Sequence, residues 1–252
     1  MSPVHRNTEE VSSLGRSVQI LRAFLRPTRH MTVEELVRRT DLPKTTVHRL
    51  VAELIRLGML ERGPSGLQLG TVVFELGEAA PQSRSLRQAA RRTLTDLSHA
   101  TNQNVGLAVL DGGEVVYLDT YIGRDAPQIP QRGGMRWPAH ASCSGKALLA
   151  FADDDVADEA LARPRRTLTD FTITGDDELR TELEEIRRRG AAFDRQESFL
   201  TVSGVAVPVF DANGDVVAAV SISGLSGRIN LPRFDIALKA AALTISRAYA
   251  AA

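Results

Sequence analysis

Hydrophobic residues recur at helical spacing between residues 42 and 58, where the sequence reads LPKTTVHRLVAELIRLG. The apolar positions follow an i, i+3, i+4, i+7 pattern, which predicts a helix with one apolar face: Val47, Leu50, Val51, Leu54 and Leu57. Pro43 suits the first turn, where a missing N–H does no harm, and Gly58 suits the position just past the last turn. The same pattern also fits an ordinary surface helix, so the flanking segments decide between the two interpretations.

The segment before this helix has the pattern of a second, shorter helix. Residues 32–39 read TVEELVRR, and Thr32 and Glu35 have the spacing of a capping box, in which each side chain accepts from the other residue's backbone N–H. Only residues 40–43 separate the two predicted helices, and this is the spacing of a helix-turn-helix.

The segment after it predicts two short strands, residues 59–62 and 67–69, around a turn at residues 63–66. Helices followed by such a hairpin predict a winged helix-turn-helix DNA-binding domain, in which residues 42–58 form the recognition helix. Its polar face offers hydroxyls, an imidazole and cations, which suit phosphate oxygens and base edges. We expect six residues to contact DNA: Lys44, Thr45, Thr46, His48, Arg49 and, in the wing, Arg62.

The chain before the helix-turn-helix predicts one more helix, at residues 13–25. Its apolar stripe would pack under the recognition helix: Val18, Ile20, Leu21, Phe24 and Leu25. Arg16 is interpreted as a solvated charge, with a phosphate contact as the alternative. Residues 1–12 are polar and lack periodicity, so we expect them to be disordered.

The chain after the wing predicts a helical linker between two domains. A short helix at residues 71–80 precedes a longer one that begins at Ser83 or Ser85. Several arginines near the start of the longer helix are interpreted as a solvated face, with contact to flanking DNA as the less favoured alternative. We therefore expect three ordered regions: a winged domain at residues 13–76, a linker at 77–100 and a second domain at 101–252.

In the second domain the hydrophobic period changes to two. Val105, Leu107 and Val109 alternate, and the Asp111-Gly112 pair predicts a tight hairpin into a strand at residues 114–121. Further strands are predicted at 202–210 and 216–223, and helices near Ser144 and at 153–162, 175–189 and 232–252. Residues 122–141 form a long irregular segment, which in a compact domain is usually functional or mobile. This order predicts an α+β domain with an antiparallel sheet flanked by helices.

Composition narrows the class of protein. The 252 residues carry no formal net charge, which argues against a globally basic nucleic-acid coat, whereas a specific DNA reader depends on its local field. No apolar run is long enough to span a bilayer, and the start of the chain has no secretory h-region. The single cysteine excludes an intrachain disulfide, and no Cys/His cluster has zinc spacing. We expect a cytoplasmic protein without a metal or other cofactor.

Several separated blocks of the chain resemble the IclR family of bacterial transcription regulators. They read SLGRSVQILRAF, LPKTTVHRLVAELIRLGMLER with the GLQLG wing, WPAHASCSGKALLAF, and GVAVPVFDANGDVVAAVSISG, and together they span about residues 13 to 250. The resemblance implies a winged-helix domain, a linker helix and a GAF-like effector domain. It also implies a dimer or tetramer that binds a palindromic operator and responds to a small, often carboxylate-bearing metabolite.

The resemblance further implies an effector pocket between the loop before the GK-containing helix and the facing sheet. The matching positions are Ser142, Cys143, Ser144, Asp194, Gly204, Ser221 and Ser223. Residues 142–145 begin a helix, whose first N–H groups and positive dipole end suit an anion. Ser221 and Ser223 lie two residues apart on a strand and so share one face, where a polar ligand or an internal hydrogen-bond network would explain them.

Two positions depart from the pattern of the family. Where the family has paired acids after the position of Asp194, this chain has Gln196 and Glu197, and Gly204 stands where a cysteine or serine is frequent. A ligand that is larger than a short acid, or differently charged, is therefore an alternative. Four residues would line such a site, although side chains of this type near a loop are more often core: Met135, Trp137, Phe199 and Leu200.

Two rival functions follow from the same residues. Cys143 lies three residues from both His140 and Lys146 at a helix start, where a thiol pKa is lowered, so a hydrolase or transferase is one rival. No partner motif or nucleophile elbow supports it, and we expect no enzymatic activity. The second rival is a DNA-binding protein whose second domain serves only for oligomerisation. We expect a ligand-responsive transcription regulator, with double-stranded operator DNA, a small effector and further copies of itself as partners.

Overall fold

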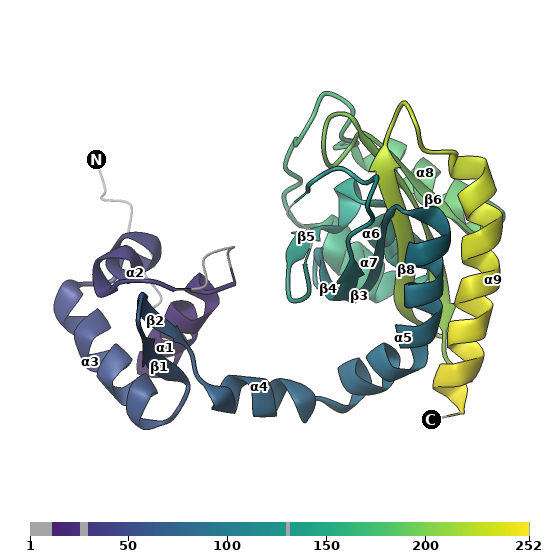
Figure 1. Ribbon diagram of the computed structural model, residues 1–252. Helices are drawn as coiled ribbons and strands as arrows, with labels where there is room; N and C mark the ends of the chain where they lie inside the picture. Colours follow the sequence, from purple (N-terminus) through teal and green to yellow (C-terminus); the bar gives the residue numbers. More distant parts are fainter. Residues whose placement is uncertain (1–11, 26–29, 130–131, 252) are drawn as a thin grey trace, which may run out of the picture. The chain divides into compact units, whose positions relative to one another are not determined.

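The computed structural model describes residues 12–25, 30–129 and 132–251. They form two compact units, Met1–Ala80 and Pro81–Ala252, called the first and the second unit below (Figure 1). The disorder expected for residues 1–12 falls outside the described residues, except at Ser12, whose hydroxyl accepts a hydrogen bond from the N–H of Gly15 at the start of the first helix.

The first unit has the predicted order of three helices and a hairpin. The antiparallel pair β1 and β2 forms the wing, and a bridge between Met31 and Leu67 joins the stretch before the second helix to it. The elements are α1 (Ser13–Ala23), α2 (Val33–Thr40), α3 (Lys44–Arg56), β1 (Leu60–Gly63) and β2 (Gly66–Leu69). Their shared core includes Ile20, Leu36, Val47, Leu50, Val51 and Leu54. This is the predicted winged helix-turn-helix.

Local sequence sets the ends of these helices as expected. The Thr32 hydroxyl accepts from the N–H of Glu35 at 3.2 Å, and the Glu35 carboxylate accepts from the N–H of Thr32 at 2.8 Å, which completes the capping box. Gly58 follows α3 with a φ of +70°, a conformation that costs glycine little.

The first helix differs from its prediction. It ends at Ala23, and the side chains of Val18 and Leu25 are 39% and 43% exposed, whereas Ile20 and Phe24 are buried. Helix α1 therefore buries a narrower stripe than the predicted one, because hydrophobicity at a position does not show which side of the helix meets a partner.

The second unit is built on one antiparallel sheet of six strands, in the order β5-β4-β3-β8-β7-β6. The four inner strands are the predicted ones, and the two short edge strands were missed because three or four residues show no clear periodicity. The strands are β3 (Asn104–Asp111), β4 (Glu114–Tyr121), β5 (Arg136–Pro138), β6 (Ala192–Arg195), β7 (Val202–Phe210) and β8 (Val216–Leu225). Strand β5 thus interrupts the segment 122–141, which was predicted to be irregular throughout.

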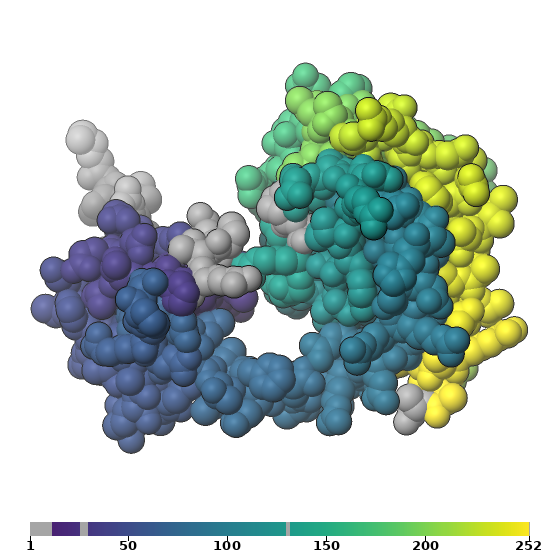
Figure 2. Space-filling model, in the orientation of Figure 1, coloured from purple at the N-terminus to yellow at the C-terminus, as the bar shows by residue number. Residues whose placement is uncertain are grey.

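Helices cover both faces of this sheet (Figure 1). Helices α5 (Pro81–Thr101) and α9 (Leu231–Ala250) pack on one face, through residues such as Leu94 and Leu238. On the other face lie the 3-10 turn η1 (Ala139–Ala141), α6 (Cys143–Phe151), α7 (Asp154–Leu161) and α8 (Asp176–Arg189). Strand β7 is buried along most of its length because both of its faces are covered. The outer side of α9 lies on the surface, where Figure 2 shows it in yellow.

The predicted linker is divided between the two units. Helix α4 (Thr71–Glu78) belongs to the first unit and buries none of its residues, with Phe74 68% exposed. Helix α5 begins at Pro81 rather than at Ser83 or Ser85, since proline is favoured in a first helical turn. Within the described parts of the chain, no helix combines the length and the apolar character needed to cross a membrane.

Candidate functional site

The six side chains expected to contact DNA lie on the outer side of the winged domain. Lys44, Thr45, His48 and Arg49 are exposed on α3, Thr46 is half-buried beside them, and Arg62 is exposed on the wing strand β1. The opposite side of α3 packs into the core through Val47, Leu50, Val51 and Leu54. Lys44 also lies 3.6 Å from the carboxylate of Glu34, in an exposed ion pair between the first turns of α3 and α2.

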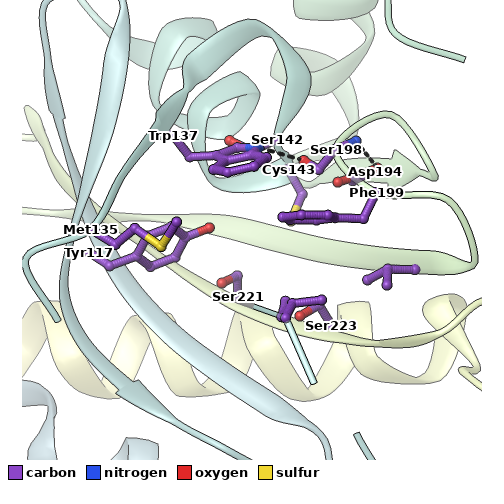
Figure 3. Close-up of a pocket in the computed structure, with 12 residues that line it drawn as sticks. Tyr117, Met135, Trp137, Ser142, Cys143, Asp194, Ser198, Phe199, Ser221 and Ser223 are labelled. Atoms are coloured by element: carbon purple, nitrogen blue, oxygen red, sulfur yellow. Dashed lines mark hydrogen bonds between the residues drawn. The ribbon is translucent and has the colours of Figure 1, made fainter. Parts of the chain in front are cut away.

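A cavity lies in the second unit, between the start of α6, the loop after β6 and the face of the sheet (Figure 3). Seven of its walls are apolar or aromatic: Tyr117, Ile129, Met135, Trp137, Cys143, Phe199 and Val202. Its polar walls are Ser142, Asp194, Ser198, Ser221 and Ser223. Among the described residues that line it, Asp194 is the one with an acidic or basic side chain.

Five of the seven positions expected for an effector line this cavity, although they come from three distant parts of the chain. Ser142 and Cys143 begin α6, Asp194 lies on β6, and Ser221 and Ser223 share one face of β8 and point into the cavity (Figure 3). The other two lie behind its wall. Ser144 is completely buried without a hydrogen-bond partner for its hydroxyl, and a Cβ on Gly204 would come within 3.0 Å of the Cys143 sulfur.

The start of α6 differs in one respect from the anion site that was expected. The Ser142 hydroxyl caps the helix by accepting from the N–H of Gly145 at 3.1 Å. One of the N–H groups assigned to a ligand is therefore already bound within the protein. Ser142 must rotate away before that N–H can bind an anion.

Asp194 is held rigidly at the cavity wall. Its Oδ1 accepts from the backbone N–H groups of Glu197 at 2.7 Å and Ser198 at 3.4 Å. Burial raises the pKa of Asp194 from 3.8 to about 6, and the negative charge of Glu197 acts in the same direction. Near neutral pH a fraction of Asp194 therefore keeps its proton and can donate it to a ligand.

A charged pair lies directly behind the cavity wall. Lys146 is only 1% exposed, and its Nζ lies 2.8 and 2.7 Å from the two carboxylate oxygens of Glu197. Glu182 on α8 lies 3.5 Å from the same nitrogen. In the sequence, Lys146 stands out only as part of a nucleophile motif and Glu197 only as a departure from a family pattern. Their pairing became visible when the fold brought residues 51 positions apart together.

An aromatic stack forms another part of the cavity wall. The rings of Trp137 and Phe199 lie 4.6 Å apart between centroids and are inclined by 24°. The Trp137 Nε1 donates to the Ser198 hydroxyl at 3.2 Å, and that hydroxyl donates to the carbonyl of Ala141 at 2.5 Å. Met135 lines the cavity as expected, whereas Leu200 is 59% exposed and does not line it. Tyr117, Ile129, Ser198 and Val202 were not predicted to line it.

The geometry does not support the nucleophile that was weighed for Cys143. Burial raises the pKa of the Cys143 thiol, and the charge of Asp194 raises it further, so the helix start does not produce a thiolate here. The Nε2 of His140 lies 3.0 Å from the carbonyl oxygen of Arg166, with which it forms a hydrogen bond. No group of His, Cys, Asp and Glu residues suited to a metal ion occurs in the described part of the chain.

Comparison with known proteins gives matches along nearly the whole chain. Residues 13–64 match the IclR helix-turn-helix domain, and residues 78–247 match the family described as bacterial transcriptional regulator IclR C-terminal. The chain is 32% identical to the HTH-type transcriptional regulator XynR of Escherichia coli, over 94% of this chain and 97% of XynR.

Solved structures give the same result for the fold. An IclR homologue from Microbacterium hydrocarbonoxydans, crystallised with 4-hydroxybenzoate, is 31% identical with a TM-score of 0.87, over 96% of this chain and 100% of that one. The IclR protein of Thermotoga maritima is 30% identical with a TM-score of 0.74, over 94% and 98% of the two chains.

Proposed function

Since the chain belongs to the IclR family of bacterial transcription regulators, and is itself a DNA-binding regulator, we propose that it binds a palindromic operator as a dimer or higher oligomer and that a small acid in the cavity of the second unit changes this binding. The observation that carries the effector half is the convergence of Ser142, Cys143, Asp194, Ser221 and Ser223 on one cavity. Because these regulators act on DNA, we propose that this one is located in the cytoplasm.

In the proposed complex α3 enters the major groove. Thr45, Thr46, His48 and Arg49 face base edges, and Arg49 is the first candidate for a bidentate contact to guanine. Lys44 at the start of the helix and Arg62 on the wing contact phosphates. The burial of the opposite side of α3 supports this orientation, because it leaves only the polar side available to DNA.

For the ligand we propose a ring-bearing acid. Trp137, Phe199, Tyr117 and Met135 offer flat or adaptable apolar walls, which suit an aromatic ring. The similar Microbacterium protein was crystallised with 4-hydroxybenzoate, and this supports the same class here. The raised pKa of Asp194 allows it to accommodate a carboxylate by donating a proton to it. A second unit that serves only for oligomerisation is the competing proposal, and the cavity with its convergent polar groups weighs against it.

The test is fluorescence anisotropy with DNA from upstream of the protein's own gene, measured against scrambled DNA across a salt series. We expect tighter binding to the native fragment, with an affinity that falls as salt rises. Addition of 4-hydroxybenzoate, with pyruvate as an acid that lacks a ring, then tests the effector half. Equal weak binding to both DNA fragments with and without acids would contradict operator recognition, and specific binding that no acid changes would favour the oligomerisation proposal.

A further inference from the structure

Lys146 and Glu197 are buried charges that touch each other but do not line the cavity. The ammonium of Lys146 donates to both carboxylate oxygens of Glu197, and a carboxylate oxygen of Glu182 lies 3.5 Å from the same nitrogen. A buried ion pair contributes little net stability, because the loss of hydration offsets the attraction between the charges. The position of this pair therefore suggests a role other than stability.

Glu197 anchors the segment that forms one wall of the cavity. Its carboxylate also accepts from the N–H of Arg195, and its carbonyl accepts from the Thr172 hydroxyl at 2.8 Å. The backbone takes positive φ values at Gln196 and Thr201, so the segment between them is a tight, non-extended loop. This loop presents Ser198 and Phe199 to the cavity.

Lys146 anchors the opposite wall. It lies in the first turns of α6, three residues after Cys143 and four after Ser142, both of which line the cavity. The ion pair therefore ties the start of α6 to the loop after β6, directly behind the cavity. Trp137 contacts the same loop through its stack on Phe199 and its hydrogen bond to Ser198, and the Ser198 hydroxyl donates to the carbonyl of Ala141, two residues before α6.

We propose that Lys146 and Glu197 are a positioning pair, which holds the start of α6 and the loop 196–201 at the separation that ligand binding requires. The pair acts through Cys143 on one side and through Ser198 and Phe199 on the other. That this separation matters for an effector rests on the proposed function. The claim that the pair sets this separation does not rest on the proposed function, and it can be tested without a ligand.

The chain carries two natural reporters for this test. Trp137 is its one tryptophan and Cys143 its one cysteine, and both line the cavity. Emission and acrylamide quenching of Trp137 report the position of the loop. The rate at which Cys143 reacts with a thiol reagent such as DTNB reports opening of the cavity, because a buried thiol reacts only from opened states.

The main variant is the double substitution Lys146→Met with Glu197→Gln, which removes both charges and leaves neither one unpaired. The control is Arg180→Met with Asp158→Asn, which removes an exposed ion pair of 2.8 Å from the same unit. We expect a folded double variant with red-shifted Trp137 emission and a Cys143 reaction that is faster by about tenfold, whereas the control should match the wild type. Lys146→Arg, which retains a cation for Glu197, should return both readouts toward wild-type values.

A folded double variant with wild-type emission and thiol reactivity would overturn the proposal. If the double variant does not fold, Glu197→Asp serves as the test instead. This variant keeps both charges and shortens the acidic side chain by one methylene. Unchanged reporters in that variant would also overturn the proposal. A protein whose reporters respond as expected, but whose operator binding no acid alters, would retain the positioning pair and refute the effector half of the proposed function.

Discussion

In the first unit the candidate functional side chains lie on the exposed side of one helix and on the wing, whereas in the second they converge from three distant segments on a cavity. Two lysines show the difference. Lys44 and Lys146 each lie near the start of a helix and each pair with a glutamate, but Lys44 is 62% exposed in its ion pair and Lys146 is 1% exposed. The exposed lysine is available to a partner outside the chain, and the buried one can act only on its own fold.

The largest expected effect is a difference in the free energy of unfolding between variants of these two lysines. Lys146→Met leaves Glu197 charged, buried and unpaired, and should lower the free energy of unfolding of the second unit by about 3–5 kcal/mol. Lys44→Met removes only an exposed pair and should leave unfolding almost unchanged while weakening operator binding on all sequences. Urea denaturation and anisotropy on both variants measure the contrast. Equal loss of stability in the two variants would contradict it.

The next effect concerns the buried carboxyl of the cavity. The pKa of Asp194 in the folded protein, about 6, lies above its ordinary value of 3.8. The folded state therefore binds more protons than the unfolded state between these values, and the free energy of unfolding falls as pH rises through this window. Asp194→Asn removes the carboxyl whose ionisation destabilises the folded state. The variant should be more stable than the wild type by about 2–3 kcal/mol at about pH 8, but not at about pH 3.

Chemical denaturation across this pH range tests the Asp194 prediction. The exposed Asp170 offers a matched control, since Asp170→Asn makes the same substitution at the surface of the same unit. A constant difference between Asp194→Asn and the wild type at every pH would show that the variant acts through packing or hydrogen bonds and not through titration.

A smaller effect is expected at the exposed face of the first unit. Arg49→Ala should weaken operator binding by about 1–3 kcal/mol and relax the preference at one base pair. Its folded stability should hardly change, because Arg49 is exposed. The control is Arg56→Ala at the far end of the same helix, where the arginine pairs with Glu53. Anisotropy on single-base operator variants tests this prediction. Equal weakening of binding on every sequence would argue against base readout.

The smallest expected effect is on the stability of the first unit. Thr32→Ala removes the hydroxyl that accepts from the N–H of Glu35 and should cost the first unit about 1 kcal/mol. Thr32→Ser keeps that acceptor and should be close to the wild type. Because the capping box lies entirely in the first unit, Trp137 fluorescence in the second unit should stay unchanged. A shift of that emission in Thr32→Ala would show that the two units do not respond independently.

The sequence by itself determined the elements whose signals are local. The spacing from Val47 to Leu54, the capping box of Thr32 and Glu35, and the glycine after α3 all depend on residues within a few positions of each other, and each occurs as predicted. The alternation of Val105, Leu107 and Val109 predicted strand β3 in the same way. The resemblance to a family added the positions of the cavity, which no periodicity in this chain indicates.

Tertiary structure alone decided several features. It chose which side of α1 is buried, it added the short strands β5 and β6, and it paired Lys146 with Glu197. It also capped Gly145 with Ser142, against the expectation of a free anion site, and raised the pKa of the Cys143 thiol, against the rival interpretation of an activated thiol. The reason is physical: burial and electrostatics depend on which distant segments surround a residue, and one sequence window does not contain those segments.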